Sequence, residues 1–212
     1  MQVISIRNFR NEELWNVLTH FSGLIMFVIG IPFLFYFDNE ITALSTISVI
    51  LFSFGLLAVY STSTLYHFFL SSKLKKMFKI LDHISIYYLI LGSYAPVCLI
   101  TLYDHSGISM FIVVLTLCII GTIKKVFFTG KYEFISLLLY LAMGWLIMFD
   151  INSLFGLINS NAKLLLILGG VSYTLGTVFY AYSNIKYFHS IWHLFVLTGS
   201  VLHYLMILFY II

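Results

Sequence analysis

The sequence predicts an all-α integral membrane protein with seven transmembrane helices, a cytoplasmic N-terminus and a C-terminus outside. Three observations lead to this fold class. A hydrophobic fraction of 61%, a charged fraction of 9% and a mean hydropathy of +1.04 exclude an ordinary soluble domain. Seven apolar segments meet or nearly meet the length of about 20 helical residues that crosses a bilayer core. Finally, basic residues are concentrated in every second connection between these segments.

The seven predicted spans follow one another along what is expected to be a single membrane domain over residues 1–212. The first is expected to be retained, because no small-residue cleavage site follows it. Span two is expected to be longer than a bilayer requires, and spans four and five are short. Pro32 and Pro96 can bend their spans, and the stretch Gly92-Ser-Tyr-Ala-Pro96 also offers small residues for close helix packing. The spans are expected at residues 15–37, 41–70, 80–102, 107–123, 133–150, 163–183 and 189–212.

The basic residues also predict the orientation. Of the 11 lysines and arginines, only Lys163 falls on the side opposite the N-terminal tail, where Asp38, Glu40, Asp104 and Asp150 also fall. The positive-inside rule therefore places the N-terminus in the cytoplasm. Because membrane topology accounts for the net charge of +3, no nucleic-acid partner is expected. The basic residues of the cytoplasmic side are Arg7, Arg10, Lys73, Lys75, Lys76, Lys79, Lys124, Lys125, Lys131 and Lys186.

Several polar residues inside the spans are expected to share one depth in the membrane. His67 lies at the end of the second span, Asp82 at the start of the third, and His189 and His193 at the start of the seventh. All three of these helix ends are predicted to face the cytoplasm. His203 would lie about 15 Å deeper than His193, at 1.5 Å per helical residue, and cannot bind the same metal ion.

This layer has the composition of a metal site. His189 and His193 are four residues apart, so they lie on one face of a helix. With His67 they would give zinc three imidazole ligands and an open fourth position, which is the catalytic arrangement. Asp82 is expected beside the ion as a hydrogen-bond acceptor or general base, and Ser63 as a hydrogen-bonding group for water or a substrate carbonyl. Imidazole also suits copper, nickel and iron.

Each of these residues has an ordinary structural interpretation as well. Histidine is tolerated at membrane interfaces, and Asp82 would be favoured at the positive end of a helix dipole. His20 either lines the same cavity or packs through hydrogen bonds, and packing is the favoured alternative. His83, about 100° from Asp82 around the helix, is expected to support the ligands from behind or to be an interhelical partner, rather than to be a ligand itself. His105 is expected to be solvated in an outside loop. The coincidence of the other residues in one layer favours a functional site.

Five motifs resemble the hemolysin III family of bacteria, a branch of the progestin and adiponectin receptor superfamily, and they keep their order along nearly the whole chain. They are Asn16-x-x-Thr-His20, Ser63-x-x-x-His67, Leu81-Asp82-His83, Gly92-Ser-Tyr-x-Pro96 and His189-x-x-x-His193. The resemblance implies a seven-helix fold with a cytoplasmic N-terminus and an intramembrane zinc ion near the cytoplasmic face. It implies His67, His189 and His193 as the zinc ligands, with Asp82 and Ser63 beside the ion or joined to it through water.

The resemblance also implies an activity, because adiponectin receptors resemble ceramide hydrolases in their site. The first hypothesis is a zinc-dependent hydrolase that acts on a lipid amide and helps to adjust membrane lipid composition or fluidity. The second is a non-enzymatic membrane sensor or regulator in which zinc is structural and joins spans two, three and seven. A pore-forming cytolysin is the third, and it is disfavoured because such a toxin would first be soluble. A fourth protein ligand such as Asp82 would indicate the structural site, and an open position the enzyme.

Overall fold

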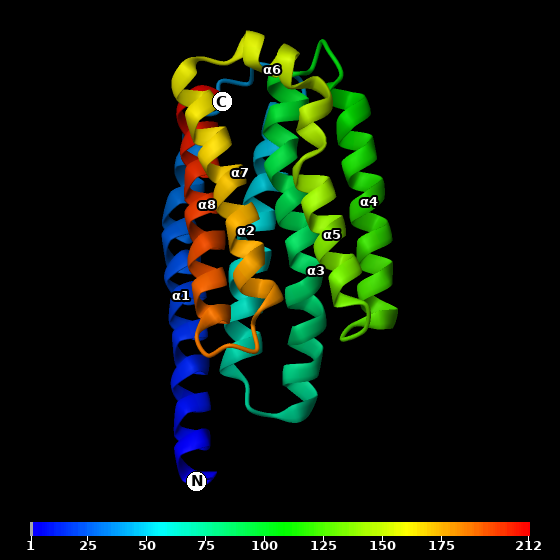
Figure 1. Cartoon of the computed structure of the whole chain (residues 1–212). Helices are drawn as coiled ribbons and strands as arrows, with labels where there is room; N and C mark the ends of the chain where they lie inside the picture. The colour runs from blue at the N-terminus through cyan, green and yellow to red at the C-terminus, as the bar shows by residue number, and fades with distance from the viewer. Residues whose placement is uncertain (1) are drawn as a thin grey trace.

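The computed structural model describes the backbone of residues 2–212 and the side chains of residues 11–212, so the side chains of Arg7 and Arg10 lie outside the described residues. Long helices run side by side through the described part of the chain and form a single bundle (Figure 1). They are α1 (Gln2–Tyr36), α2 (Ser45–Phe68), α3 (Ser72–Pro96), α4 (Gly107–Phe128), α5 (Glu133–Gly144), α6 (Ile151–Leu157), α7 (Ser160–Ala181) and α8 (Phe188–Tyr210).

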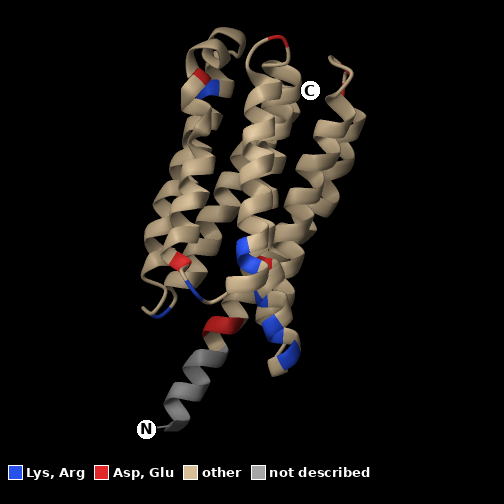
Figure 2. Cartoon of the chain, turned by 90° about the vertical axis from the view of Figure 1, so that its right-hand side faces the viewer, with Lys and Arg blue, Asp and Glu red and all other residues tan. Residues whose placement is uncertain are grey.

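Seven helical stretches in the described residues are long and apolar enough to cross a membrane. They are Asn11–Tyr36, Ser45–Phe68, Ser72–Thr101, Gly107–Phe128, Glu133–Leu157, Ser160–Ala181 and Phe188–Tyr210. The predicted all-helical fold with seven spans is therefore confirmed. The side of the membrane that each end faces stays a prediction from the charges, although most of the lysines gather at one end of the bundle (Figure 2).

Three predicted spans begin at other residues in the structure, and the first of them, α1, already begins at Gln2 rather than near residue 15. α3 begins at Ser72 rather than near residue 80, so the lysines assigned to a loop occupy its first turns. Lysine is a good helix former, and this helix continues beyond its apolar part. α2 begins at Ser45 rather than near residue 41, because a turn precedes it. In that turn the backbone N–H of Thr42 donates to Ser45 Oγ at 2.9 Å.

Two spans contain a local break in the α-helix. After Pro96 the third span continues as a short π-helix, Val97–Thr101, in which the N–H of Leu102 donates to the carbonyl of Val97 at 2.9 Å. Proline removes one backbone donor, so a change of helix type beside it is expected. The fifth span consists of α5, a 3-10 turn over Leu146–Asp150, and α6, so it reaches residue 157 rather than ending at 150.

Helices α2 and α3 pack closely through two glycines. A Cβ atom added to Gly92 would lie 2.7 Å from the carbonyl oxygen of Leu51, and one added to Gly55 would lie 2.6 Å from the carbonyl oxygen of Tyr88. These neighbours are backbone atoms, so a side-chain rotation cannot make room. This close approach joins residues 51–55 of α2 to residues 88–92 of α3.

We expect Gly92→Ala to destabilise the protein by about 1–3 kcal/mol, which is the usual cost of overpacking. The matched control is Gly170→Ala on α7, because a Cβ atom there would meet no atom within 4 Å. That change should be neutral or stabilise the helix by up to about 1 kcal/mol. Thermal unfolding of both variants in detergent tests the contrast. Equal stability of the two variants would contradict this account of the packing.

Candidate metal centre

Three histidines from two helices meet near one end of the bundle. His67 is the penultimate residue of α2, and His189 and His193 lie in the first two turns of α8. Each offers one ring nitrogen, and these three nitrogens lie within 4.8 Å of one another. The ring centroids are 5.1 Å apart for His67 and each partner, and 4.5 Å apart for the pair on α8. This group could bind a metal ion.

The start of α8 is fixed by contacts with α1. Tyr187 adopts a left-handed conformation with φ of 66°, and this turns the chain from the preceding loop into the helix. Its N–H donates to Glu12 Oε1 at 3.0 Å. Ser190 then donates to Asn16 Oδ1 at 2.5 Å. These contacts hold the first turn of α8, and His189 with it, against α1.

The ring nitrogens are suited to a metal ion. His67 Nε2 and His189 Nε2 are buried and have no hydrogen-bond partner among the described residues. Buried polar atoms are normally paired, so two unpaired nitrogens that face a third histidine indicate a missing partner. Three neutral imidazoles form a donor set that zinc and other divalent transition metals accept. The residues therefore fit a metal ion, although the donor set alone does not select zinc.

Asp82 and Ser63 lie close to this group without joining it. Both side chains are buried, with exposed fractions of 8% for Asp82 and 1% for Ser63, and both line the same cavity as His189 and His193. Within the described residues, the group of converging ligand atoms consists of the three histidines and does not include the Asp82 carboxylate. The arrangement therefore leaves Asp82 available as a proton acceptor at the cavity wall.

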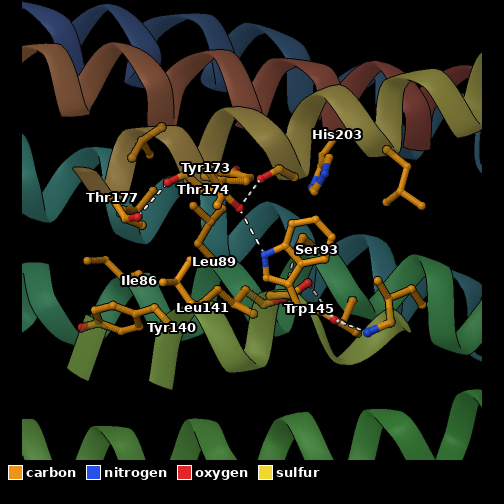
Figure 3. Close-up of a pocket in the computed structure, with 18 of the residues that line it drawn as sticks. Ile86, Leu89, Ser93, Tyr140, Leu141, Trp145, Tyr173, Thr174, Thr177 and His203 are labelled. Atoms are coloured by element: carbon orange, nitrogen blue, oxygen red, sulfur yellow. Dashed lines mark hydrogen bonds between the residues drawn. The ribbon is translucent and has the colours of Figure 1, made fainter. Parts of the chain in front are cut away.

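The cavity has a volume of about 490 Å³ and walls that are mostly apolar. It extends between α3 and α5 on one side and α7 and α8 on the other (Figure 3). Trp145 Nε1 donates to Thr174 Oγ1 at 3.2 Å across it. His189 and His203 both line the cavity, so it runs about 21 Å along α8 at 1.5 Å per residue. Its length and composition suit an extended hydrocarbon chain.

The remaining histidines have different surroundings. His20 lines the cavity, and its ring centroid is 3.9 Å from that of His193. Neither of its ring nitrogens has a partner among the described residues, so the favoured expectation of hydrogen-bonded packing was wrong. His203 lines the cavity far from the group, and its Nε2 is also unpaired within the described structure. His105 is exposed in a loop, as expected.

A second buried polar cluster was not predicted. Lys125 was assigned to a loop but lies inside α4 with an exposed fraction of 1%. Its ammonium group donates to Glu133 Oε2 at 2.5 Å and lies 3.2 Å from His83 Nδ1. His83 is therefore an interhelical partner facing α4 and α5, as its position on the helix predicts. The cluster gives the buried lysine the paired acid that a buried charge needs.

Sequence reasoning also missed two residues that contact the histidine group and a third that contacts one of these two. Glu13 is 2.6 Å from His67 Nδ1, and Thr19 Oγ1 is 3.2 Å from His193 Nδ1. Lys75 contacts Glu13 in turn. The available signal was the spacing of Glu13, Asn16 and Thr19, which places three polar residues at intervals of three along one side of α1.

Seven spans and a histidine group at one end define a multi-pass protein of the cell membrane with a candidate metal centre. The family described as "Haemolysin-III related" matches residues 8–204. The chain belongs to this family, as its motifs predicted.

Relatives cover the whole fold. The "Hemolysin-3 homolog" of Bacillus subtilis (strain 168) is 36% identical over 200 residues, which are 94% of each chain. The "Hemolysin-3" of Bacillus cereus is 36% identical over 205 residues, or 96% of this chain and 94% of that one. The human "Monocyte to macrophage differentiation factor" is 29% identical over 202 residues, or 91% of this chain and 82% of that one. The similarity thus extends from bacterial to animal proteins.

Proposed function

We propose that this protein is a zinc-dependent hydrolase that cleaves an amide bond of a membrane lipid. The observation that carries the proposal is the group of His67, His189 and His193 beside a long apolar cavity whose wall carries Asp82 and Ser63. A site of three histidines with no fourth protein ligand is the catalytic type. The position of Asp82 outside the histidine group supports this type over a structural site.

The residues around the cavity have distinct roles in this proposal. Zinc held by the three histidines would supply the Lewis acid that polarises the amide carbonyl and makes water a better nucleophile. Asp82 accepts the proton of the attacking water and returns it to the departing amine as the C–N bond breaks. Ser63 donates a hydrogen bond to the substrate carbonyl. The products are a free fatty acid and an amine, and their ratio is one to one.

The cavity and the charge pattern support a lipid as the proposed substrate. An acyl chain fits the apolar walls, which also keep bulk water from the reacting bond. Most lysines lie at the histidine end of the bundle, which supports a cytoplasmic position for this end under the positive-inside rule, and in this proposal the reaction occurs in the inner leaflet. Such an activity would adjust membrane lipid composition or fluidity. The proposed partner is therefore a membrane lipid and not a nucleic acid.

The test compares zinc-loaded and chelator-treated protein in vesicles that contain a ceramide, or a matched acyl ester. Mass spectrometry of the free fatty acid and of the amine measures the reaction. We expect zinc-dependent release of both products from the ceramide. Fully loaded, folded protein that releases nothing from either lipid would contradict the proposal. If chelation then lowered the thermal stability, the metal would be structural, as in the sensor hypothesis.

A further inference from the structure

We propose that Glu13 is a positioning residue that prepares His67 to bind the metal ion. The inference rests on the proposed metal centre but not on hydrolysis. Glu13 Oε2 is 2.6 Å from His67 Nδ1, and both side chains are largely buried. A carboxylate only accepts hydrogen bonds, so Nδ1 carries the proton and donates it. Nε2 is then the nitrogen with the free lone pair, and it is the buried nitrogen without a partner among the described residues.

Glu13 is itself held in place by a lysine of α3. Its other carboxylate oxygen, Oε1, accepts a hydrogen bond from Lys75 Nζ at 2.6 Å. The Lys75 ammonium group also lies 5.3 Å from the centroid of the Tyr66 ring. α3 therefore fixes an acid on α1, and this acid fixes a ligand on α2. Both carboxylate oxygens of Glu13 are thus held by side chains of neighbouring helices.

Asn16 does not replace Glu13 in this role. Its amide nitrogen is 3.5 Å from His67 Nδ1, which is at the limit of a hydrogen bond. Its amide oxygen accepts a hydrogen bond from Ser190 at 2.5 Å, so the amide is committed to α8. Glu13, and not Asn16, therefore makes the short hydrogen bond with His67 Nδ1.

A residue of α1 also fixes the proton position of a second ligand, His193. Thr19 Oγ1 lies 2.9 Å from the carbonyl oxygen of Trp15 and 3.0 Å from that of Asn16. A hydroxyl group has one proton to donate, and Thr19 donates it in the hydrogen bond to these carbonyl oxygens. Toward His193 Nδ1, at 3.2 Å, Thr19 is therefore the acceptor. His193 also carries its proton on Nδ1 and presents Nε2. α1 thus sets the tautomer of two ligands while supplying none.

A carboxylate behind a ligating histidine raises the basicity of the ring and fixes its orientation. Loss of such a partner typically costs about 10–100-fold in metal affinity. We expect Glu13→Ala to weaken zinc binding by about this factor. Glu13→Gln retains an amide oxygen that can accept a hydrogen bond from the Nδ1–H group. It should therefore lose less zinc affinity than the alanine variant. Glu40→Gln is the charge-matched control, because Glu40 is exposed in the loop between α1 and α2.

The experiment measures zinc affinity by competition with a chromophoric chelator, using the full chain in detergent. The visible absorption of cobalt(II)-substituted protein is recorded as well, because it responds to the ligand geometry and not to general stability. The expected order of zinc affinity is wild type equal to Glu40→Gln, then Glu13→Gln, then Glu13→Ala, with an altered cobalt spectrum in the last. Because Glu13→Gln preserves size and shape, it keeps the test decisive if the alanine variant fails to fold.

The outcomes separate this inference from the proposed function. Affinities of the Glu13 variants within about twofold of wild type, well short of the expected loss, would overturn it. A wild-type protein that binds no zinc or cobalt would overturn both proposals. A wild type that binds zinc and loses affinity with Glu13→Ala, yet cleaves no lipid, would support the positioning role and remove only the hydrolase.

Discussion

Replacement of Asp82 by asparagine is expected to lower the rate of lipid-amide hydrolysis by about 10²–10⁴-fold, the usual contribution of a general base. Asparagine has the same shape as aspartate but cannot take a proton from water. Because the carboxylate lies outside the histidine group, zinc content should stay near that of the wild type. The measurement is kcat for ceramide cleavage, determined together with the zinc content of the same preparation.

The control for this change is Asp104→Asn, which removes an exposed carboxylate from the loop between α3 and α4. It should leave both the rate and the zinc content unchanged. If Asp82→Asn lost zinc, the carboxylate would be a ligand, and a closed structural site would become the better description. An unchanged rate would exclude Asp82 as the base.

Replacement of His193 by alanine is expected to remove zinc from the purified protein. The change leaves two of the three histidines. The zinc affinity should therefore fall by more than the 10–100-fold that follows the loss of a residue hydrogen-bonded to a ligand. Metal content after dialysis, measured by mass spectrometry, tests this expectation. The matched control is His203→Ala on the same helix, because His203 lines the cavity but is not in the histidine group.

The same pair of variants also tests the link between metal and stability. Zinc that binds only the folded state at 100 times its Kd would stabilise that state by about 2.7 kcal/mol. Wild type and His203→Ala should therefore show a zinc-dependent rise in the unfolding temperature, and His193→Ala should not. Zinc retention by His193→Ala together with zinc loss by His203→Ala would place the metal elsewhere in the cavity.

The sequence predicted the number of spans because hydropathy reports which segments are long and apolar enough for lipid. It did not predict that α3 begins at Ser72, since a helix that projects beyond its apolar part leaves no hydropathy signal. The fifth span was predicted too short for a related reason. Its 3-10 turn at Leu146–Asp150 interrupts the α-helix, and the pattern of apolar residues does not distinguish a local break from an end.

The histidine group was predictable because the i, i+4 spacing and the shared depth are properties of single helices. The role of Glu13 was not, because it depends on how α1 is rotated against α2. The same holds for Lys125, whose basic side chain suggested a loop although Glu133 lies beside it in the folded bundle. Contacts between helices depend on how the helices pack, and they cannot be predicted from the spacing of residues within one helix.

The chain order of the three histidines has a consequence for the biosynthesis of the protein. His67 enters the membrane with the second span, but His189 and His193 arrive with the seventh, after four intervening spans. A nascent chain that still lacks its last helix holds only one of these three histidines. A metal ion that needs all three could therefore load only after complete insertion, and a chain truncated before α8 would lack this site.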